Sequence, residues 1–350
     1  MLVPDANMLA VTVIDLFSRM NREGIDYVLL RNYELYPEFG HDIDLIVRER
    51  DLPGLKAAAA SCATDHGWIA LTECDHWARS ASLGHRFQKL RFYTTDPPQC
   101  LQIDVFHSLW ALGVPLIDED ALLQGRLWDH RGFYRIDGHV ENLYRLLQIA
   151  NNLSVKSDSP EIMLRFQRYR ERVLSFLETA VDFAETAAAL GFPKIPAALA
   201  LLRSGDLLSF KKEIDRQKRA WLRGRLAAQP FRTVKMLCDR SANHLQRFWL
   251  RPCGFAIRAF AGDAQQRARL ERVMGQLAEA NVVSAFTSSR SFKERLRVKA
   301  AGGIILEWTS RESAQVVMDG EADAQRVMTK LLTLLVERHP KVMDRRDTLS

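Results

Sequence analysis

Three aspartates are the residues whose types and spacing carry the clearest chemistry in this sequence. Asp42 and Asp44 stand two apart in the apolar run DIDLIV, and Asp104 interrupts the apolar run LQIDVF. Because side chains alternate along a strand, the first two carboxylates would share one face while their apolar neighbours face the core. Neighbouring carboxylates repel each other unless a cation lies between them, and Mg²⁺ binds carboxylate oxygens while leaving positions for phosphate. The spacing therefore predicts that Asp42, Asp44 and Asp104 are catalytic ligands of Mg²⁺, with room for two metal ions.

Two cations and two histidines accompany the aspartates. Lys89 and Arg91 alternate on the strand before Asp104 and could hold the oxygens of a triphosphate, although a solvated strand face explains them equally well. His41 precedes the first two carboxylates and His107 follows the third. Each histidine could support the metal ligands, but a histidine satisfied within its own loop is the favoured interpretation.

The elements that must position these residues form a mixed α/β domain over residues 1–153. Apolar periodicity and turn residues predict helices at 7–22, 51–63 and 141–153, and strands at 27–30, 42–47, 87–93 and 101–106. An Asp-Pro-Pro turn joins the last two strands. About 150 residues is a common size for a domain with one core.

Arg31-Asn32, followed by DIDL and by a third aspartate on a later strand, resembles the nucleotidyltransferase superfamily with its DNA polymerase β-like minimal fold. More closely, LLRNYE…DIDLIV…D before a helical region is similar to a bacterial branch that is fused to a thymidylate kinase-like domain. Genes of that branch often stand beside surface-polysaccharide genes. The resemblance implies a minimal nucleotidyltransferase fold with a mixed sheet, and Mg²⁺-dependent transfer of a nucleotidyl group from an NTP to an unknown acceptor.

The chain departs from this family where phosphate should be held. The family's small Gly-Gly or Gly-Ser pair is Arg31-Asn32 here, so charge on Arg31 would replace close approach of the backbone. Arg31, Asn32, Lys89 and Arg91 are therefore the expected nucleotide-binding residues. An alternative function is a catalytically inactive assembly or regulatory protein that keeps the fold as an interaction surface. A third, supported by basic residues alone, is a nucleotidyltransferase that modifies RNA or protein.

Residues 154–251 are expected to form a basic helical region that holds the excess positive charge of the chain. Between Arg203 and Arg251 stand thirteen Lys/Arg and four Asp/Glu, a local balance of +9 in a chain of net charge +6. The basic residues of its central part are Lys211, Lys212, Arg216, Lys218, Arg219, Arg223 and Arg225. Phe210 and Trp221 are interleaved with them, a pattern that suits an acidic protein, a membrane surface or nucleic acid as partner. A charged, solvated helix face is the favoured interpretation.

Residues 252–340 are expected to form a small second α/β unit, followed by a tail at 341–350. The pattern predicts strands at 255–260 and 303–308, and helices at 264–280 and 322–338. The loop AGDAQQRA stands where a P-loop has GxxxxGK[ST], and every consensus position is lost. The unit therefore resembles a degenerate, truncated thymidylate kinase-like domain without kinase activity; an unrelated α/β module is the alternative.

Composition excludes several classes of protein. Of the 350 residues, 47% are hydrophobic and 26% charged, which is typical of a folded globular chain and not of a disordered or collagenous one. The five cysteines are odd in number and form no CxxC pair, so neither a zinc site, a disulfide framework nor a Cys/His arrangement is apparent. No apolar run approaches the ~20 residues that span a bilayer. We expect a cytoplasmic protein, with the basic segment as its one means of contact with the inner face of the membrane.

Overall fold

The computed structural model describes residues 6–39, 42–72, 76–77, 86–95, 98–112, 114–153, 160–238, 256–260, 263–279, 305–308, 316–317, 326 and 329–330. Over these residues the chain is a mixed α/β protein, as the sequence predicts. Each helix and strand predicted between residues 7 and 153 is present, with bounds that differ by a few residues.

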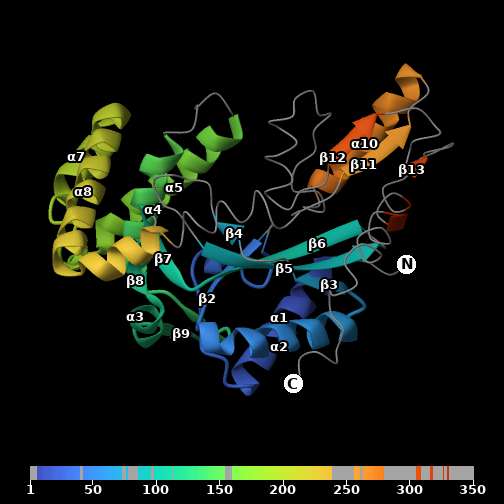
Figure 1. The fold of residues 1–350 in the computed structure, drawn as a ribbon, viewed down its shortest axis with the longest axis horizontal. Coiled ribbons are helices and arrows are strands. Elements are labelled where there is room, and N and C mark those ends of the chain that lie inside the picture. Colours follow the sequence, from blue (N-terminus) through green and yellow to red (C-terminus); the bar gives the residue numbers. More distant parts are fainter. Residues whose placement is uncertain are drawn as a thin grey trace.

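A mixed eight-stranded sheet forms the centre of the N-terminal part (Figure 1). Its strands are β1 (Tyr27–Leu29), β2 (Asp42–Val47), β3 (Ile69–Thr72), β4 (His76–Trp77), β5 (Arg86–Thr95), β6 (Pro98–Phe106), β9 (Leu127–Asp129) and β10 (Phe133–Arg135). Their order is β3-β5-β6-β2-β1-β10-β9, with β4 beside β5. Strand β2 runs parallel to β6 and β1 parallel to β10, whereas the other pairs are antiparallel.

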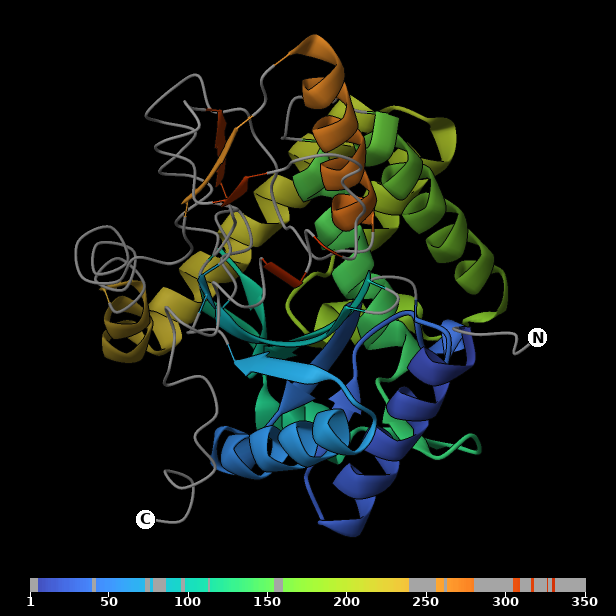
Figure 2. The same ribbon diagram turned by 90° about the vertical axis from the view of Figure 1, so that its right-hand side faces the viewer.

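Helices α1 (Ala6–Arg22) and α2 (Leu52–Asp65) cover one face of this sheet (Figure 2). Helix α1 is amphipathic, so its apolar side chains recur at helical spacing on the side that meets the sheet. Helix α2 has Pro53 in its first turn, where a proline breaks no helical hydrogen bond. The fully buried apolar side chains of this layer include Val13, Leu16, Phe17, Met20, Leu55, Ile43, Leu45, Ile103 and Val105.

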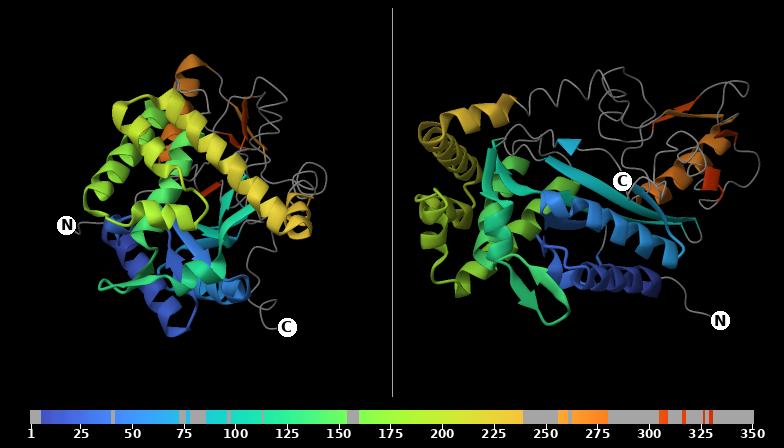
Figure 3. Two further views of the ribbon diagram at one scale, coloured as in Figure 1. Left: turned by 90° about the vertical axis from the view of Figure 1, so that its left-hand side faces the viewer. Right: turned by 60° about the horizontal axis from the view of Figure 1, so that its bottom comes forward.

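A second core joins the other face of the sheet to a bundle of helices (Figure 3). The helices are α4 (Gly138–Asn152), α5 (Pro160–Thr179), α6 (Phe183–Ala189), α7 (Ile195–Ser204) and α8 (Leu207–Ala228). Helix α4 begins at the N-cap Asp137, whose side chain accepts hydrogen bonds from the backbone N–H groups of His139 and Val140. Ile46 of β2 and Phe106 of β6 belong to this second core, because their side chains point away from α1 and α2.

Several short elements between the sheet and α4 were not predicted. Strands β7 (Ser108–Ala111) and β8 (Val114–Asp118) form a separate hairpin that leads into α3 (Glu119–Gln124). Strands β9 and β10 form a second hairpin on the edge of the main sheet. Two 3-10 turns, η1 (Tyr33–Leu35) and η2 (Glu49–Asp51), flank β2.

The basic region is largely helical over its described residues, 160–238, as predicted, but part of its expected surface is buried. Phe210, Lys218 and Trp221 of α8 are 0%, 0% and 9% exposed. The Lys218 Nζ lies 2.9 Å from an oxygen of Asp215. Phe210 and Trp221 form the apolar face that packs α8 onto the bundle. The interpretation that these two side chains face a partner is therefore wrong. None of the described helices is both long and apolar enough to cross a membrane.

The C-terminal part has the predicted succession of strand and helix. Strand β11 (Ala256–Phe260) lies between the parallel strands β12 (Ile305–Trp308) and β13 (Val316–Val317), and helix α10 (Ala264–Glu279) follows β11. The first two residues of the degenerate P-loop segment lie outside the described residues. Most of the helix expected at 322–338 and the tail also lie outside them.

Candidate functional site

Asp44 and Asp104 lie opposite each other on two neighbouring strands. Strands β2 and β6 pair in parallel, with Asp44 opposite Asp104 and Asp42 opposite Gln102. Residues paired in this way project from the same face of a sheet. The register thus brings Asp44 and Asp104 together and gives Asp42 the adjoining position, although the side chain of Asp42 is not among those described.

Strand alternation explains why acidic residues occupy this face. The apolar residues on either side of the two aspartates are all fully buried beneath α1 and α2: Ile43, Leu45, Ile103 and Val105. Asp44 and Asp104 point to the opposite face, where they are only 1% and 8% exposed. A carboxylate buried to this degree is costly unless hydrogen-bond donors or cations surround it. The surroundings of each carboxylate therefore decide what the site can do.

Asp104 is held by a chain of buried polar side chains. The Nε2 of Gln102 donates a hydrogen bond to Asp104 Oδ1 over 2.9 Å, and the Nε of Arg91 donates to Gln102 Oε1 over 3.0 Å. Gln102 is 6% exposed and Arg91 3% exposed. Sequence analysis missed Gln102, although its position two residues before Asp104 on the same strand face was a usable signal.

Strand β5 places its predicted cations beside the acidic strands. It pairs antiparallel with β6, so that Lys89 lies opposite Asp104 and Arg91 opposite Gln102. The side chain of Lys89 is not among those described. Arg91 is buried and engaged with Gln102, so the interpretation of this face as a solvated one is wrong at Arg91.

Asp44 is held by a different cation. The Nε of Arg31 donates to Asp44 Oδ2 in an ion pair, and the Nη1 of Arg31 donates to the hydroxyl of Tyr169 over 2.9 Å. The side chain of Asp44 has no exposed surface, whereas that of Arg31 is 19% exposed. Arg31 was predicted to bind phosphate; in the structure its guanidinium contacts one of the predicted metal ligands.

Asn32 is the second residue of the Arg31-Asn32 pair. It has a backbone conformation that glycine favours. Its φ of 60° and ψ of 18° lie in the left-handed region, which asparagine tolerates better than most residues. The Oδ1 of Asn32 accepts a hydrogen bond of 3.3 Å from Arg172 Nη1, and Arg172 also forms an ion pair with Glu34. Helix α5, which carries Tyr169 and Arg172, therefore holds the 31–34 loop at two points.

Helix α4 carries a buried tyrosine hydroxyl whose pKa is influenced by the charges of the same ion pair. Tyr144 is 4% exposed, and burial raises the pKa of its hydroxyl. The charge of Arg31 counters this rise of the pKa, and the charge of Asp44 adds to it. Helix α5 supplies a polar group to the ion pair through Tyr169, and the sequence did not indicate this helix as part of the site.

The donor set fits a divalent cation by its chemistry. Asp44 and Asp104 offer carboxylate oxygens from adjoining positions of two strands, and Mg²⁺ prefers such oxygens. Among the described side chains, Asp44 is paired with Arg31, and Asp104 is linked through Gln102 to Arg91. Both carboxylates therefore already have cationic groups of the chain in their surroundings.

Of the two histidines near the site, the structure describes only His107. His107 is 7% exposed, and its Nδ1 lies 3.0 Å from the backbone oxygen of Val47. One ring nitrogen of His107 is thus satisfied, by a neighbouring strand and not by its own loop, whereas Nε2 is buried with no hydrogen-bond partner among the described residues. His41 lies outside the described residues.

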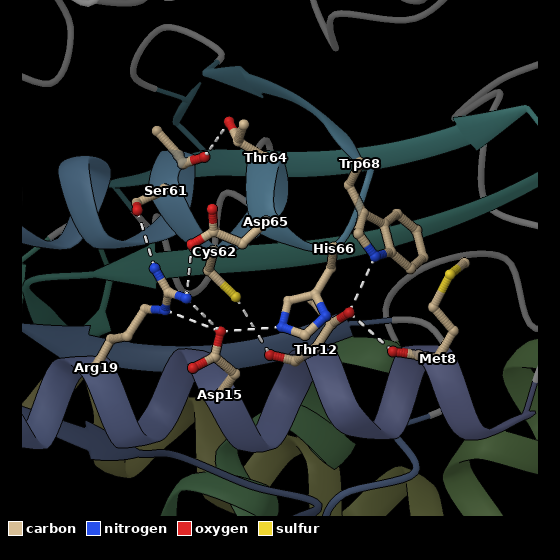
Figure 4. A network of polar contacts seen from close by, with 11 residues as sticks. Met8, Thr12, Asp15, Arg19, Ser61, Cys62, Thr64, Asp65, His66 and Trp68 are labelled. Carbon is tan, nitrogen blue, oxygen red and sulfur yellow. Dashed lines mark hydrogen bonds and ion pairs between the residues drawn. The ribbon is translucent and has the colours of Figure 1, made fainter.

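A second polar cluster, which the sequence did not indicate, joins α1 to the end of α2 (Figure 4). Atoms of Asp15, Cys62 and His66 that could bind a metal all lie within 4.8 Å of one another. No Cys/His arrangement was apparent from the sequence, because His66 and Asp15 are 51 positions apart and only the packing of two helices brings them together.

The hydrogen bonds of this cluster describe a helix contact. The same oxygen of Asp15 lies 2.7 Å from Arg19 Nη2 and 3.0 Å from His66 Nε2. Burial disfavours the Asp15 carboxylate, but hydrogen bonds from Arg19 and His66 outweigh it and lower the pKa of Asp15. Burial also raises the pKa of Cys62 to about 12, and its thiol donates to the backbone oxygen of Thr12 over 3.5 Å. A protonated thiol and a carboxylate already paired with an arginine are poor metal ligands.

No family model matches the chain, and no curated protein or solved structure matches it.

Proposed function

We propose that this chain is a nucleotidyltransferase-fold protein that binds an NTP together with Mg²⁺ at Asp42, Asp44 and Asp104. The observation that carries the proposal is the register of β2 with β6, which sets Asp44 opposite Asp104 on the face that turns away from α1 and α2. Two carboxylates in adjoining positions beside a strand that carries cations suit a metal-bound triphosphate. The acceptor is unknown, and a role in surface-polysaccharide synthesis is part of the proposal only through the resemblance.

The residues of the chain would have distinct roles in such a transfer. Bound Mg²⁺ would supply charge neutralisation at the triphosphate and a lower pKa for the acceptor hydroxyl. Gln102 fixes the rotamer of Asp104, since it holds one of the two carboxylate oxygens. Lys89 on β5 would face the phosphates, whereas Arg91 would act on Asp104 through Gln102. The burial of both aspartates would exclude water from their oxygens.

Calorimetric titration of the full chain tests this function. We expect the wild type to bind at least one of the four NTPs in the presence of Mg²⁺. Asp44→Asn and Asp104→Asn should each weaken that binding by about tenfold or more, because each removes a charge that a metal-bound triphosphate requires. Glu185→Gln, which alters an exposed carboxylate on α6, should leave the affinity unchanged. Equal NTP affinity in the wild type and both aspartate variants would contradict the proposal.

One observation favours the alternative of a catalytically inactive assembly or regulatory protein. Arg31 forms an ion pair with Asp44, so one predicted metal ligand already has a cationic partner inside the chain. The two candidates differ in turnover. Release of pyrophosphate from an NTP by the wild type, lost in Asp104→Asn, would favour the enzyme, and NTP binding without turnover would favour the alternative.

A further inference from the structure

The guanidinium of Arg31 occupies the surroundings of Asp44 that a divalent cation would need. Asp44 has no exposed side-chain surface, and Arg31 reaches it from the loop that follows β1. An ion pair this well buried is strong only when its remaining donors are also satisfied. Tyr169 meets that condition, because its hydroxyl accepts a second hydrogen bond from Arg31.

We propose that Arg31 is an internal competitor of the divalent cation at Asp44, and that helix α5 holds it in the competing position. The inference rests on the proposed function for the cation itself, and it adds the regulation of that site. A cation that binds Asp44 must either displace the guanidinium or accept a positive charge beside it in a buried environment, where like charges repel more strongly than in water.

Helix α5 stabilises the competing position through two side chains one turn apart. Tyr169 binds Arg31 directly, and Arg172 binds Asn32 and Glu34 on the same loop. Release of Arg31 from Asp44 therefore has to break a contact with α5 or move the helix with the loop. The site on the sheet and the helical bundle are coupled through these contacts.

A nucleotide would relieve the competition. The triphosphate offers oxygens to which a guanidinium binds as well as it does to a carboxylate. When Arg31 moves to phosphate, Asp44 becomes available to the cation, so each ligand should raise the affinity of the other by the same factor. The wild type should thus bind the bare cation weakly and the cation with nucleotide much more tightly.

The test is a titration of the full chain with Mn²⁺ alone, in which electron paramagnetic resonance measures the free ion. We expect Arg31→Gln to bind Mn²⁺ about tenfold more tightly than the wild type, and Tyr169→Phe to shift the affinity in the same direction by about two- to fivefold. Arg168→Gln changes an exposed arginine on the same helix and should have no effect. The gain should disappear in the double variant Arg31→Gln/Asp44→Asn.

Two results would overturn the inference, and they differ in what they say of the proposed function. Equal Mn²⁺ affinity in the wild type, Arg31→Gln and Tyr169→Phe, with loss of binding in Asp44→Asn, would remove the competition and leave the cation site intact. Absence of Mn²⁺ binding in every variant would overturn the cation site and the competition together. Circular dichroism shows whether each variant is folded. If Arg31→Gln does not fold, Tyr169→Phe alone still tests the competition.

Discussion

Gln102 is a residue that orients Asp104 by a hydrogen bond. It accepts a hydrogen bond from Arg91 and donates one to Asp104, and all three side chains are buried. A polar side chain that links a buried cation to a buried anion cannot be replaced by an apolar one without loss of both hydrogen bonds.

We expect Gln102→Leu to lower the free energy of unfolding by about 1–3 kcal/mol, because a lost hydrogen bond to a buried charged group is worth this much. Urea denaturation measures the change, with Gln124→Leu on the exposed side of α3 as the matched control. The same variant should weaken Mg²⁺-dependent NTP binding. A Gln102→Leu protein as stable as the wild type, with unchanged NTP affinity, would show that this hydrogen-bond chain does not hold Asp104.

Residue types and spacing were sufficient to find the two described carboxylates, but not their partners. An acidic residue inside an apolar strand is visible in the sequence because it interrupts the pattern. The ion pair of Arg31 with Asp44 is not visible, because it depends on where the chain turns after β1. Tyr169 lies 138 positions from Arg31, and no local pattern relates the two.

Strands β1, β2, β5 and β6 and helices α1 and α4 were predictable from their apolar pattern, and α2 from its Asp-Leu-Pro start and alanine-rich run, whereas β3 and β4 of the same sheet were not predicted. The hairpins β7–β8 and β9–β10 were missed because their strands have only three to five residues, too few to establish an alternation. In the helical region the Gly-Phe-Pro at 191–193 marks the break between α6 and α7. The break between α7 and α8 is marked by Gly205, which adopts a left-handed backbone conformation.

The turn between α6 and α7 supplies a prediction about the packing of the bundle. Gly191 has a φ of +91°, and a Cβ at this position would lie 2.7 Å from Cδ1 of Trp221. Gly205 has a similar φ of +79°, but a Cβ there would meet no atom within 4 Å. The two glycines therefore share a backbone constraint and differ in the space around them.

We expect Gly205→Ala to lower the free energy of unfolding by about 1–2 kcal/mol, the cost of a left-handed conformation for alanine. Gly191→Ala should cost about 1–3 kcal/mol more, because Trp221 must also move. Chemical denaturation of the two variants measures the difference. Equal losses of stability would mean that the contact between the α6–α7 turn and α8 is loose.

At the scale of the whole molecule, the helical bundle both buries its apolar face and reaches the sheet site. Helix α8 turns Phe210, Lys218 and Trp221 inward, while Lys212 and Arg219 remain exposed. The exposed cations agree with a charged, solvated helix face, and contact with an acidic protein, a membrane surface or nucleic acid stays a prediction. Helix α5 is the element that connects this bundle to Arg31 and Asn32.

The most direct test of the central claim is the anomalous scattering of Mn²⁺ in a crystal of the full chain grown with a non-hydrolysable NTP. We expect a peak about 2.1 Å from carboxylate oxygens of both Asp44 and Asp104, the distance at which a small divalent cation binds oxygen. We also expect Arg31 to have left Asp44 for a phosphate oxygen. A structure with saturating Mn²⁺ and nucleotide that shows no peak beside either aspartate, and Arg31 still paired with Asp44, would contradict the claim.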